Sequence, residues 1–374
     1  MRVLHVISDE NIGGAGVLLT TLLETMDRDR VQSTVALPYG SLLTERIKAL
    51  GVPTRLLKYP CDRCSLSSVK EIGRLIRTER IDIVHANAAI AARIAGRWCG
   101  VTVVHTRHCC FPPSGLLRVR PMRAMSGFAN RFLSDRVIAT AEAAAENLRL
   151  LGIPNEKIEL IINGSKPIRT VSDVELDALR KKLGLTKEDF CVGICARLEE
   201  YKGHDTFLCA AKQVLKQKNA KNIRFLIVGD GSMRETLERQ VRDEKLEHEV
   251  IFTGFVADMA PIYRLLDLNV NCSRGTETSC LALSEGMSAS LPFLATDYGG
   301  NAAMAGESAA GILYPVNDFV RLAELIFKIA ADPALHARMR SAARARYEQK
   351  YTAEEMSAHL TAVYEELMRL KGAK

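Results

Sequence analysis

The sequence is poor in aromatic residues and has no long apolar run. Aromatics make up 6% of the 374 residues, with a single tryptophan. No apolar stretch approaches the roughly 18 residues that a membrane-spanning helix requires. The strand-like segment Arg2 to Ser8 leaves no room for a charged and apolar leader, so we expect none. Any membrane contact is therefore expected to be peripheral.

The cysteines lack the pattern of a disulfide framework or of a zinc site. Ten cysteines are spread over a long chain without a leader, which favours a reduced, cytoplasmic protein. Cys61 and Cys64 form one C-x-x-C pair, but no second pair follows. Cys109 and Cys110 lie beside His108 without the paired spacing of known zinc sites. We therefore expect no metal and no other resident cofactor.

The net charge is too small to point to nucleic acid. Lysine and arginine number 51 against 44 acidic residues, a net charge of +7, and we expect no nucleic-acid partner. One segment differs from the rest, because residues 109–134 contain no acidic residue. Apolar residues alternate there with four arginines, Arg118, Arg120, Arg123 and Arg131. The segment predicts a basic and apolar surface, and Pro121 interrupts any single long helix within it.

Short β-branched runs alternate with helical patterns along the whole chain, which is typical of parallel sheets flanked by helices. Hydrophobic residues make up 47% of the sequence, enough for two cores. The pattern predicts two Rossmann-like α/β domains, residues 1–165 and 166–351, with a final helix at 352–374 that crosses back onto the first. The predicted strands lie near 2–8, 31–38, 54–60, 82–87, 101–108 and 136–141, and then near 190–196, 223–229, 249–254, 267–272, 292–296 and 311–314.

Ligands of such sheets bind outside the carboxyl ends of the strands, so the residues after each strand are the candidates for function. After the first strand come Gly13, Gly14, Ala15 and Gly16, whose N–H groups could face a phosphate at a helix start. A tight turn without a ligand is the alternative. Leu19 stands where a dinucleotide fingerprint needs its third glycine, which argues against a nicotinamide oxidoreductase.

Two further strand ends carry charge or imidazole. The strand 101–106 delivers His105 and His108, either of which could face a polar ligand, although a lone histidine is usually structural. The strand 191–196 is followed by Arg197 and Lys202, a cation pair suited to a diphosphate. A solvated surface pair is the alternative reading.

Two glutamates with seven residues between them give the most informative pattern. If a helix begins near Ser279, Glu277 lies beside its start and Glu285 almost two turns in, so the two carboxylates can contact opposite ends of one polar ligand. A helix cap plus a surface glutamate is the alternative. Glycine turns at Gly229 and at Gly299-Gly300 add backbone N–H groups near the same strand ends.

The order of these motifs resembles the retaining GT-B glycosyltransferases of group 1, also called glycosyltransferase family 4, over nearly the whole chain. The resemblance implies that Arg197 and Lys202 hold the donor diphosphate, Glu277 contacts the transferred sugar and Glu285 the ribose. It also implies that His108, rather than His105, touches the sugar. The remaining donor-binding positions implied are Gly14, Ala15, Gly16, Gly229, Thr278, Ser279, Cys280 and Leu281.

Three positions depart from the family pattern, and they bear on the donor sugar more than on the reaction. After Gly299-Gly300 the family often has a glutamate, where this chain continues with Asn301 and alanines. Ser290 replaces a common glycine, and Arg274 stands beside the sugar-binding loop.

The resemblance implies an activity and its partners. A hexose would pass from a nucleoside diphosphate sugar, with uridine the commonest base, to an acceptor hydroxyl with the anomeric configuration kept and without a metal. The N-terminal domain would bind the acceptor and the C-terminal domain the donor, in the cleft between them. A lipid-linked or cell-surface glycan, such as lipopolysaccharide, capsule or exopolysaccharide, is the expected acceptor.

Alternatives remain for the activity and for the basic segment. One is a nucleotide-sugar-binding subunit without catalysis, and another is an epimerase or phosphorylase of similar fold. Residues 109–134 then fit either docking on anionic lipid at the inner face of the plasma membrane or an ordinary exposed helix.

Overall fold

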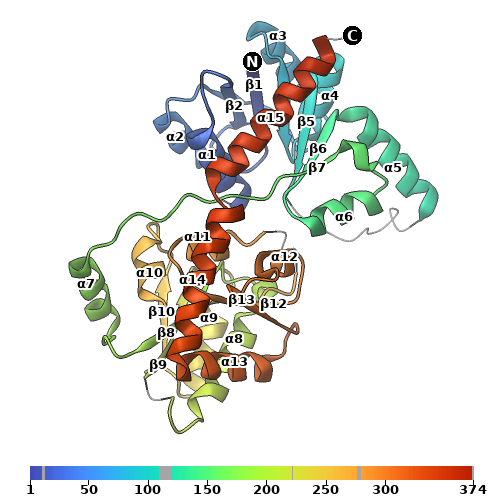
Figure 1. The fold of residues 1–374 in the computed structure, drawn as a ribbon. Helices are drawn as coiled ribbons and strands as arrows, with labels where there is room; N and C mark the ends of the chain where they lie inside the picture. The colour runs from blue at the N-terminus through green and yellow to red at the C-terminus, as the bar shows by residue number, and fades with distance from the viewer. Residues whose placement is uncertain (11–12, 109–118, 221, 276–278, 373–374) are drawn as a thin grey trace. The chain divides into compact units, whose positions relative to one another are not determined.

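A computed structural model describes residues 1–10, 13–108, 119–220, 222–275 and 279–372. These residues form two compact units (Figure 1). Unit 1 contains residues 1–165 together with 353–374, and unit 2 contains residues 166–352. The two units are described separately below.

Unit 1 is built on a parallel sheet in the order β3-β2-β1-β4-β5-β6-β7. Its strands are β1 (Arg2–Ile7), β2 (Gln32–Pro38), β3 (Thr54–Leu57), β4 (Ile83–Asn87), β5 (Thr102–Arg107), β6 (Arg136–Ala139) and β7 (Ile158–Leu160). Its helices are α1 (Gly14–Thr25), α2 (Leu43–Ala49), α3 (Leu66–Thr78), α4 (Ile90–Trp98), α5 (Arg120–Leu133), α6 (Glu142–Leu150), the 3-10 turn η2 (Asn155–Lys157) and α15 (Ala353–Gly372). The chain order reverses between β1 and β4, as in a doubly wound fold.

Unit 2 repeats this plan with the parallel order β10-β9-β8-β11-β12-β13. Its strands are β8 (Phe190–Cys195), β9 (Ile223–Val228), β10 (Val250–Gly254), β11 (Leu268–Asn271), β12 (Phe293–Thr296) and β13 (Gly311–Tyr314). Its helices are α7 (Asp173–Leu183), the 3-10 turn η3 (Glu200–Lys202), α8 (His204–Leu215), α9 (Arg234–Asp243), α10 (Ala260–Leu265), α11 (Leu281–Ser288), α12 (Asn301–Ala305), α13 (Phe319–Ala331) and α14 (Pro333–Lys350). Here the order reverses between β8 and β11.

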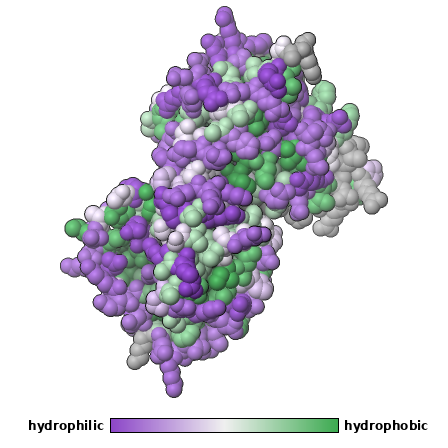
Figure 2. Space-filling model, in the orientation of Figure 1, coloured by the Kyte–Doolittle hydropathy of each residue, from purple (hydrophilic) through white to green (hydrophobic). Residues whose placement is uncertain are grey.

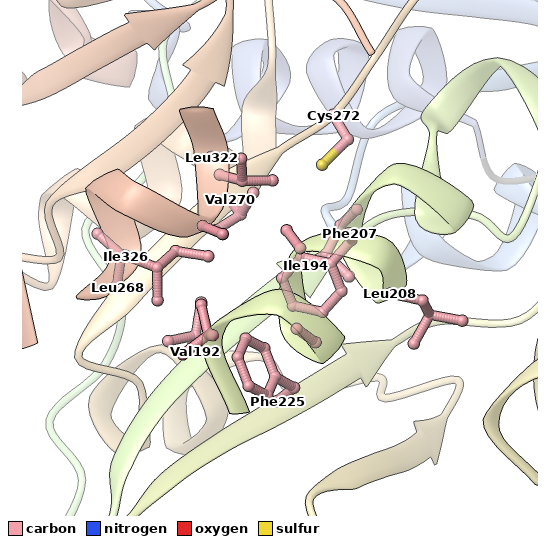
Figure 3. Packing of buried hydrophobic residues seen from close by; sticks show 14 of the residues in the cluster. Val192, Ile194, Phe207, Leu208, Phe225, Leu268, Val270, Cys272, Leu322 and Ile326 are labelled. Atoms are coloured by element: carbon pink, nitrogen blue, oxygen red, sulfur yellow. The ribbon is translucent and has the colours of Figure 1, made fainter. Parts of the chain in front are cut away.

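The central strands are apolar because helices cover both faces of each sheet. In unit 2, Val192 and Ile194 of β8 belong to one core with Phe207 of α8 and Ile326 of α13 (Figure 3). The opposite face packs against helices α7 and α10 through a second core. The Phe207 and Phe225 rings meet edge to face at 5.7 Å between centroids. Figure 2 shows that hydrophilic residues cover most of the visible surface of each unit, with smaller apolar areas between them.

Helix α15 packs against α1 and thereby makes the last residues part of unit 1. Tyr364 is fully buried on its inner face. Two ion pairs tie its outer side to the unit, Arg30 with Glu365 at 2.6 Å and Arg136 with Glu366 at 2.8 Å. Helix α15 therefore covers the face of the sheet to which α1 also belongs.

The two doubly wound sheets confirm the predicted fold class, with small differences in the elements. Strand β7 was not predicted, because its three residues follow the 3-10 turn η2 and are too short to give a periodic signal. Pro121 stands in the first turn of α5, where its missing N–H costs nothing, and the helix begins there after the extended Val119, as the predicted interruption requires.

Candidate active site

The carboxyl ends of β8, β9 and β11 bring three loops of unit 2 together. The loop after β8 meets the loop after β9, where Leu198 N donates to Asp230 O at 3.0 Å. The same loop meets the one after β11, where Arg274 N donates to Tyr201 O at 2.9 Å. We call this region the carboxyl edge of unit 2. It lies where the strand order reverses, which is the usual ligand position in such sheets.

The two predicted diphosphate cations lie around one aromatic ring. The exposed Arg197 guanidinium donates from Nη2 to the Tyr201 hydroxyl at 2.7 Å. The Lys202 Nζ lies 5.4 Å from the centre of the same ring. Two cations five residues apart thus share one partner at the carboxyl edge, and both can offer N–H groups to an anion.

Two glycines allow these loops to approach each other closely. Gly203 has φ of +71°, and a Cβ there would lie 2.2 Å from the Cys272 carbonyl oxygen. Gly229 has φ of +136°, and its Cβ would lie 2.1 Å from the Ala196 carbonyl oxygen. Both positions need a residue without a side chain. At Gly229, the close approach of the Ala196 carbonyl is enough to require glycine, whether or not a ligand binds there.

Glu285 lies on α11 at the same edge. Its Oε2 accepts a hydrogen bond from the buried Tyr263 hydroxyl at 2.8 Å. Burial raises the pKa of this carboxyl, and the Tyr263 bond acts in the opposite direction. Burial and the Glu285 charge together raise the pKa of the Cys195 thiol, two residues before Arg197. Glu285 therefore belongs to the carboxyl edge together with the segment that carries the cations.

Helix α11 begins later than predicted. Its first residue is Leu281, after an extended Cys280, instead of a residue near Ser279, so Glu285 lies only about one turn in. The Cys280 thiol accepts from Asn271 Nδ2 at 3.1 Å, which holds the segment before α11 against β11. The Ser279 hydroxyl is buried and has no hydrogen-bond partner among the described residues. Glu277 and Thr278 lie outside the described residues.

Two of the three departures from the family pattern, Asn301 and Arg274, have structural explanations, and Ser290 has none. Asn301 is fully buried, and its Nδ2 donates to the Thr296 carbonyl at 3.1 Å. Arg274 forms an ion pair with Asp205 at 3.0 Å, which links the loop after β11 to α8. Ser290 has φ of +62°, a backbone conformation that favours glycine.

In unit 1, the predicted glycine loop is part of a helix. Gly14, Ala15 and Gly16 form the first turn of α1 instead of a loop before it, because the extended Gly13 caps the helix. The first helical hydrogen bond runs from Val17 N to Gly13 O at 3.0 Å, so the preceding N–H groups have no partner within the helix. A Cβ on Gly16 would lie 2.7 Å from the Leu43 side chain. The close packing of α1 on α2 thus explains this glycine.

Buried histidines line the corresponding edge of unit 1. His85 Nε2 and the Thr106 hydroxyl are 2.6 Å apart, and the other ring nitrogen of His85 bonds the Tyr364 hydroxyl of α15. His108 Nε2 lies 2.9 Å from Asn87 Oδ1. His105 Nδ1 lies 3.1 Å from the Ala86 carbonyl oxygen. We call this region the carboxyl edge of unit 1.

Burial keeps these imidazoles uncharged. It lowers the pKa of His108 to about 4, and also to about 4 the pKa of His5, a residue of β1 whose ring centre lies 5.4 Å from that of His85. Burial, assisted by the Arg93 charge, lowers the pKa of His105 to about 3. The pKa of His85 is also well below its ordinary value, chiefly because of burial. At neutral pH the edge of unit 1 therefore presents neutral hydrogen-bonding groups.

A small cavity of about 30 Å³ opens between these polar groups and helices α1 and α15. His85, Asn87, Thr106 and His108 form part of its wall. Asn87 is 6% exposed, and its Nδ2 has no hydrogen-bond partner among the described residues. A space of this size accepts a water molecule or one hydroxyl group of a larger ligand.

A larger hollow of about 470 Å³ lies elsewhere on unit 1, near the amino ends of β1, β2 and β3. Its arginines already have protein partners, since Arg28 donates to the Leu50 carbonyl at 2.8 Å and Arg55 pairs with Glu79. We place the candidate site at the carboxyl edges because the polar groups there follow the strands at which the chain order reverses.

The basic segment is described in part. Arg118 lies outside the described residues, and Arg120 and Arg123 lie in α5 without a described side chain. Arg131 is exposed, as are Phe128 at 74% and Phe132 at 66%. Trp98 is 60% exposed at the end of α4, and Arg97 before it donates from Nε to the Phe132 carbonyl of α5 at 2.6 Å, which joins the two helices. We call Trp98, Phe128, Arg131 and Phe132 the α4–α5 surface.

No helix in the described part of the chain is both long and apolar enough to span a bilayer.

Two family models match this chain in tandem. Residues 12–167 match the model "Glycosyltransferase Family 4", and residues 176–346 match "Glycosyl transferases group 1". The chain belongs to the group 1 glycosyltransferases. The matches follow unit 1 and unit 2 in turn, and together they extend over most of the sequence.

Relatives and solved structures agree with this assignment. The chain is 27% identical over 324 residues to the putative glycosyltransferase EpsD of Bacillus subtilis, covering 82% of each protein. It is 26% identical to an Escherichia coli UDP-Gal:alpha-D-GlcNAc-diphosphoundecaprenol alpha-1,3-galactosyltransferase, covering 80% of this chain and 79% of that protein. The Anabaena HepE structure in complex with UDP has a TM-score of 0.85 at 23% identity and covers 98% of this chain and 100% of its own. The likeness confirms the predicted GT-B fold.

In this group 1 glycosyltransferase, the structure places several of the predicted site residues at the carboxyl edges and identifies further residues that contact them. Arg197 and Lys202 both contact Tyr201 at the carboxyl edge of unit 2, and Glu285 lies at the same edge. Gly14 and His108 follow β1 and β5 in unit 1. Sequence reasoning missed three polar residues that contact predicted ones, Tyr201, Tyr263 and Asn87. Asn87 ends β4 and could have been found by inspecting that strand end, whereas Tyr263 gave no signal.

Proposed function

We propose that this glycosyltransferase is a retaining hexosyltransferase that uses a UDP-sugar and transfers its sugar to a hydroxyl of a lipid-linked or cell-surface glycan. The observation that carries the proposal is the pair of cations, Arg197 and Lys202, around Tyr201 at the carboxyl edge of unit 2. Two cations at a strand end are suited to two phosphate groups.

One relative supports uridine as the base together with a lipid-linked acceptor, and solved neighbours support uridine. The Escherichia coli relative is a UDP-Gal transferase whose named acceptor is a diphosphoundecaprenol-linked sugar. Solved structures of Anabaena HepE contain UDP and UDP-glucose. By similarity, we propose a UDP-hexose as donor.

The residues would divide the chemistry between them. Arg197 and Lys202 would stabilise the charge that develops on the leaving diphosphate, and Glu285 would accept hydrogen bonds from the ribose. Glu277 and the neutral His108 would orient the transferred sugar. The bond from the anomeric carbon to the diphosphate oxygen breaks, and the bond to the acceptor oxygen forms on the same face. The acceptor proton passes to the leaving phosphate, so the residues mainly position the substrates.

The acceptor side of the proposal rests on the α4–α5 surface and the basic segment. Exposed aromatic side chains beside arginines are suited to the headgroup region of an anionic membrane. Replacing Arg118, Arg120 and Arg123 by alanine should reduce sedimentation with phosphatidylglycerol vesicles and leave the weak sedimentation with phosphatidylcholine vesicles unchanged. Equal binding of the variant and the parent protein to anionic vesicles would favour an ordinary solvated helix.

The first experiment is the thermal stabilisation of the purified protein by UDP, GDP, ADP and their sugar conjugates. A ligand that binds only the folded state raises the melting temperature, so a shift with one nucleotide identifies the base. No shift with any of them would favour a protein that does not bind nucleotides. The anomeric configuration of the product, read from its proton NMR couplings, then tests retention.

Glu277→Ala tests the assigned catalytic role. We expect transfer to fall at least about 100-fold, because a contact to the reacting sugar is lost, while UDP affinity stays near that of the parent protein. Turnover and calorimetric UDP binding are measured on the same preparation. Unchanged turnover would remove Glu277 from the mechanism.

A further inference from the structure

Tyr201 occupies the space between the two proposed diphosphate cations. Its hydroxyl accepts from Arg197 Nη2 at 2.7 Å, and its ring centre lies 5.4 Å from Lys202 Nζ. The residue stands in the 3-10 turn η3, four positions after Arg197 and next to Lys202. One side chain therefore contacts both cations.

The backbone of Tyr201 is itself held by the loop after β11. The Tyr201 carbonyl oxygen accepts from Arg274 N at 2.9 Å. A Cβ on Gly275 would lie 3.3 Å from the Tyr201 Cβ, so the backbone of that loop packs directly against the tyrosine. Arg274 is in turn fixed by its ion pair with Asp205 at 3.0 Å. Tyr201 thus connects the loop after β8 to the loop that leads to Glu277.

Without such a partner, Arg197 would be an exposed and mobile side chain close to a like charge. An exposed arginine has many rotamers, and fixing them on binding reduces affinity. A hydroxyl bond to one guanidinium nitrogen leaves the remaining N–H groups for an anion. A ring beside Lys202 holds the ammonium by a cation–π contact without using its N–H donors.

We infer that Tyr201 is a positioning residue that holds Arg197 and Lys202 in place for a nucleoside diphosphate. The inference rests on the proposed function, since it assigns the diphosphate to this edge. It adds that the affinity for the diphosphate depends on a neutral side chain that does not touch the phosphates.

The opposite role is a resting latch, and it predicts the opposite sign. If the tyrosine hydroxyl merely occupied Arg197 until a phosphate displaced it, removing the hydroxyl would tighten UDP binding. A positioning role requires weaker binding after the same change. The sign of the effect therefore distinguishes the two.

Two substitutions separate the two contacts. Tyr201→Phe removes the hydroxyl bond and keeps the ring, and we expect UDP affinity to fall roughly 3- to 10-fold. Tyr201→Leu removes both contacts, and we expect a further loss of about 2- to 5-fold. Affinities are measured by calorimetry with UDP and with uridine, which lacks the phosphates. Uridine binding should change less than twofold.

A matched control and a double-mutant cycle exclude a general structural effect. Tyr351→Phe removes another tyrosine hydroxyl of unit 2, whose bond to the Ala303 carbonyl oxygen is 3.1 Å long, and should leave UDP affinity unchanged. In an Arg197→Ala background, Tyr201→Phe should cost no further affinity, because the guanidinium that it positions is absent. Melting temperatures of all variants verify folding.

The outcomes separate the inference from the proposed function. If the parent protein binds none of UDP, GDP and ADP, the proposed function fails and the inference falls with it. If the parent protein binds UDP and Arg197→Ala weakens it, but Tyr201→Phe binds UDP equally well or more tightly, the inference alone is overturned. A loss in Tyr201→Phe that persists in full on the Arg197→Ala background would also overturn it.

Discussion

The carboxyl edges of the two sheets have the same topology and opposite chemical character. Each edge lies where a doubly wound parallel sheet reverses its strand order. The edge of unit 2 presents the cations Arg197 and Lys202 and the carboxylate Glu285. The edge of unit 1 presents imidazoles that burial keeps neutral, with His108 beside Asn87. One fold thus places a cation pair at one edge and neutral imidazoles, next to Arg107 at the end of β5, at the other.

The difference follows from where each edge keeps its polar groups. In unit 1 they lie beneath α1 and α15, and Tyr364 reaches His85 from a helix that is remote in sequence. In unit 2, Arg197 is exposed and borders solvent. A buried site can hold only neutral or paired groups, whereas an exposed loop can carry net charge. From this comparison we propose an anionic ligand for unit 2 and a hydroxyl-bearing, uncharged group for unit 1.

The largest expected difference between the two units is their response to acid, which should destabilise unit 1. The folded pKa values of His5, His105 and His108 lie near 4, 3 and 4, below the unfolded value of 6.5. As pH falls from 6.5 to 4, these histidines become protonated in the unfolded chain but stay neutral in the folded unit. The free energy of unfolding is therefore highest above pH 6.5 and decreases over that range. At pH 5 each of the three histidines lowers the free energy of unfolding by about 2 kcal/mol relative to neutral pH.

Unit 2 should resist this change better. Burial raises the pKa of Glu285 and of Asp267, so these carboxyls favour the folded state as pH falls. In unit 1 burial raises the pKa of Asp9 in the same way, but the histidines with lowered pKa values outnumber it there. One histidine there, His204, has a pKa lowered to about 4 by burial and works in the opposite direction. Hydrogen exchange at pH 7 and pH 5, corrected for intrinsic rates, compares β1, β4 and β5 with β8, β9 and β11. Equal loss of protection in both sheets would contradict the prediction.

Removing the two cations should take the proposed diphosphate partners away from the edge of unit 2. For Arg197→Ala with Lys202→Ala we expect UDP affinity to fall about 100-fold or more, because two charge-assisted contacts are lost. The remaining affinity should depend less on salt than that of the parent protein. Calorimetry at two salt concentrations measures both effects.

Lys212→Ala is the matched control for the cation pair. Lys212 lies on α8 of the same unit and pairs with Glu244 at 3.0 Å, away from the strand ends. Its loss changes the net charge of unit 2 without touching the carboxyl edge. If the control weakened UDP binding as much as the double variant, a general charge effect would replace the assigned site.

A charge introduced into unit 1 tests the neutral edge. Asn87→Asp places a carboxylate where Asn87 Oδ1 now meets His108 Nε2 at 2.9 Å. A neighbouring anion favours the imidazolium, so the pKa of His108 should rise from about 4 toward its ordinary value of 6.5. NMR titration of labelled histidine follows the change, and Asn87→Ala supplies the uncharged control. An unchanged His108 titration in Asn87→Asp would mean that the two side chains do not meet in solution.

The fold was largely predictable because its strands are short apolar runs between turns, such as Ile223–Val228 in unit 2. The motifs at strand ends also followed from sequence, since parallel sheets gather those ends on one edge. Helix starts were less predictable. Gly14 lies inside α1 and Leu281 begins α11, because capping depends on the backbone angles of the preceding residue.

Contacts between distant residues could not be predicted. Tyr263 reaches Glu285 across 22 positions, and Tyr364 reaches His85 across 279. Neither pair leaves a periodic or local signal in the sequence, because the packing of whole helices decides which side chains meet. The burial of the histidines, and hence their lowered pKa values, could not be predicted from the sequence for the same reason.

The smallest expected effect is a change at Ser290 that alters the stability of unit 2 without altering ligand binding at its carboxyl edge. Ser290 has φ of +62° in the turn before β12, at the end of that strand opposite the site. A residue with a Cβ is strained there, so Ser290→Gly should stabilise unit 2 by about 0.5–1 kcal/mol, less than the strain itself because glycine loses more freedom on folding. Chemical denaturation measures the gain, with Ser290→Ala as a control that keeps the Cβ. Since the turn lies away from the carboxyl edge, UDP affinity should stay constant. A gain shared by Ser290→Ala would trace the effect to the hydroxyl instead of the backbone.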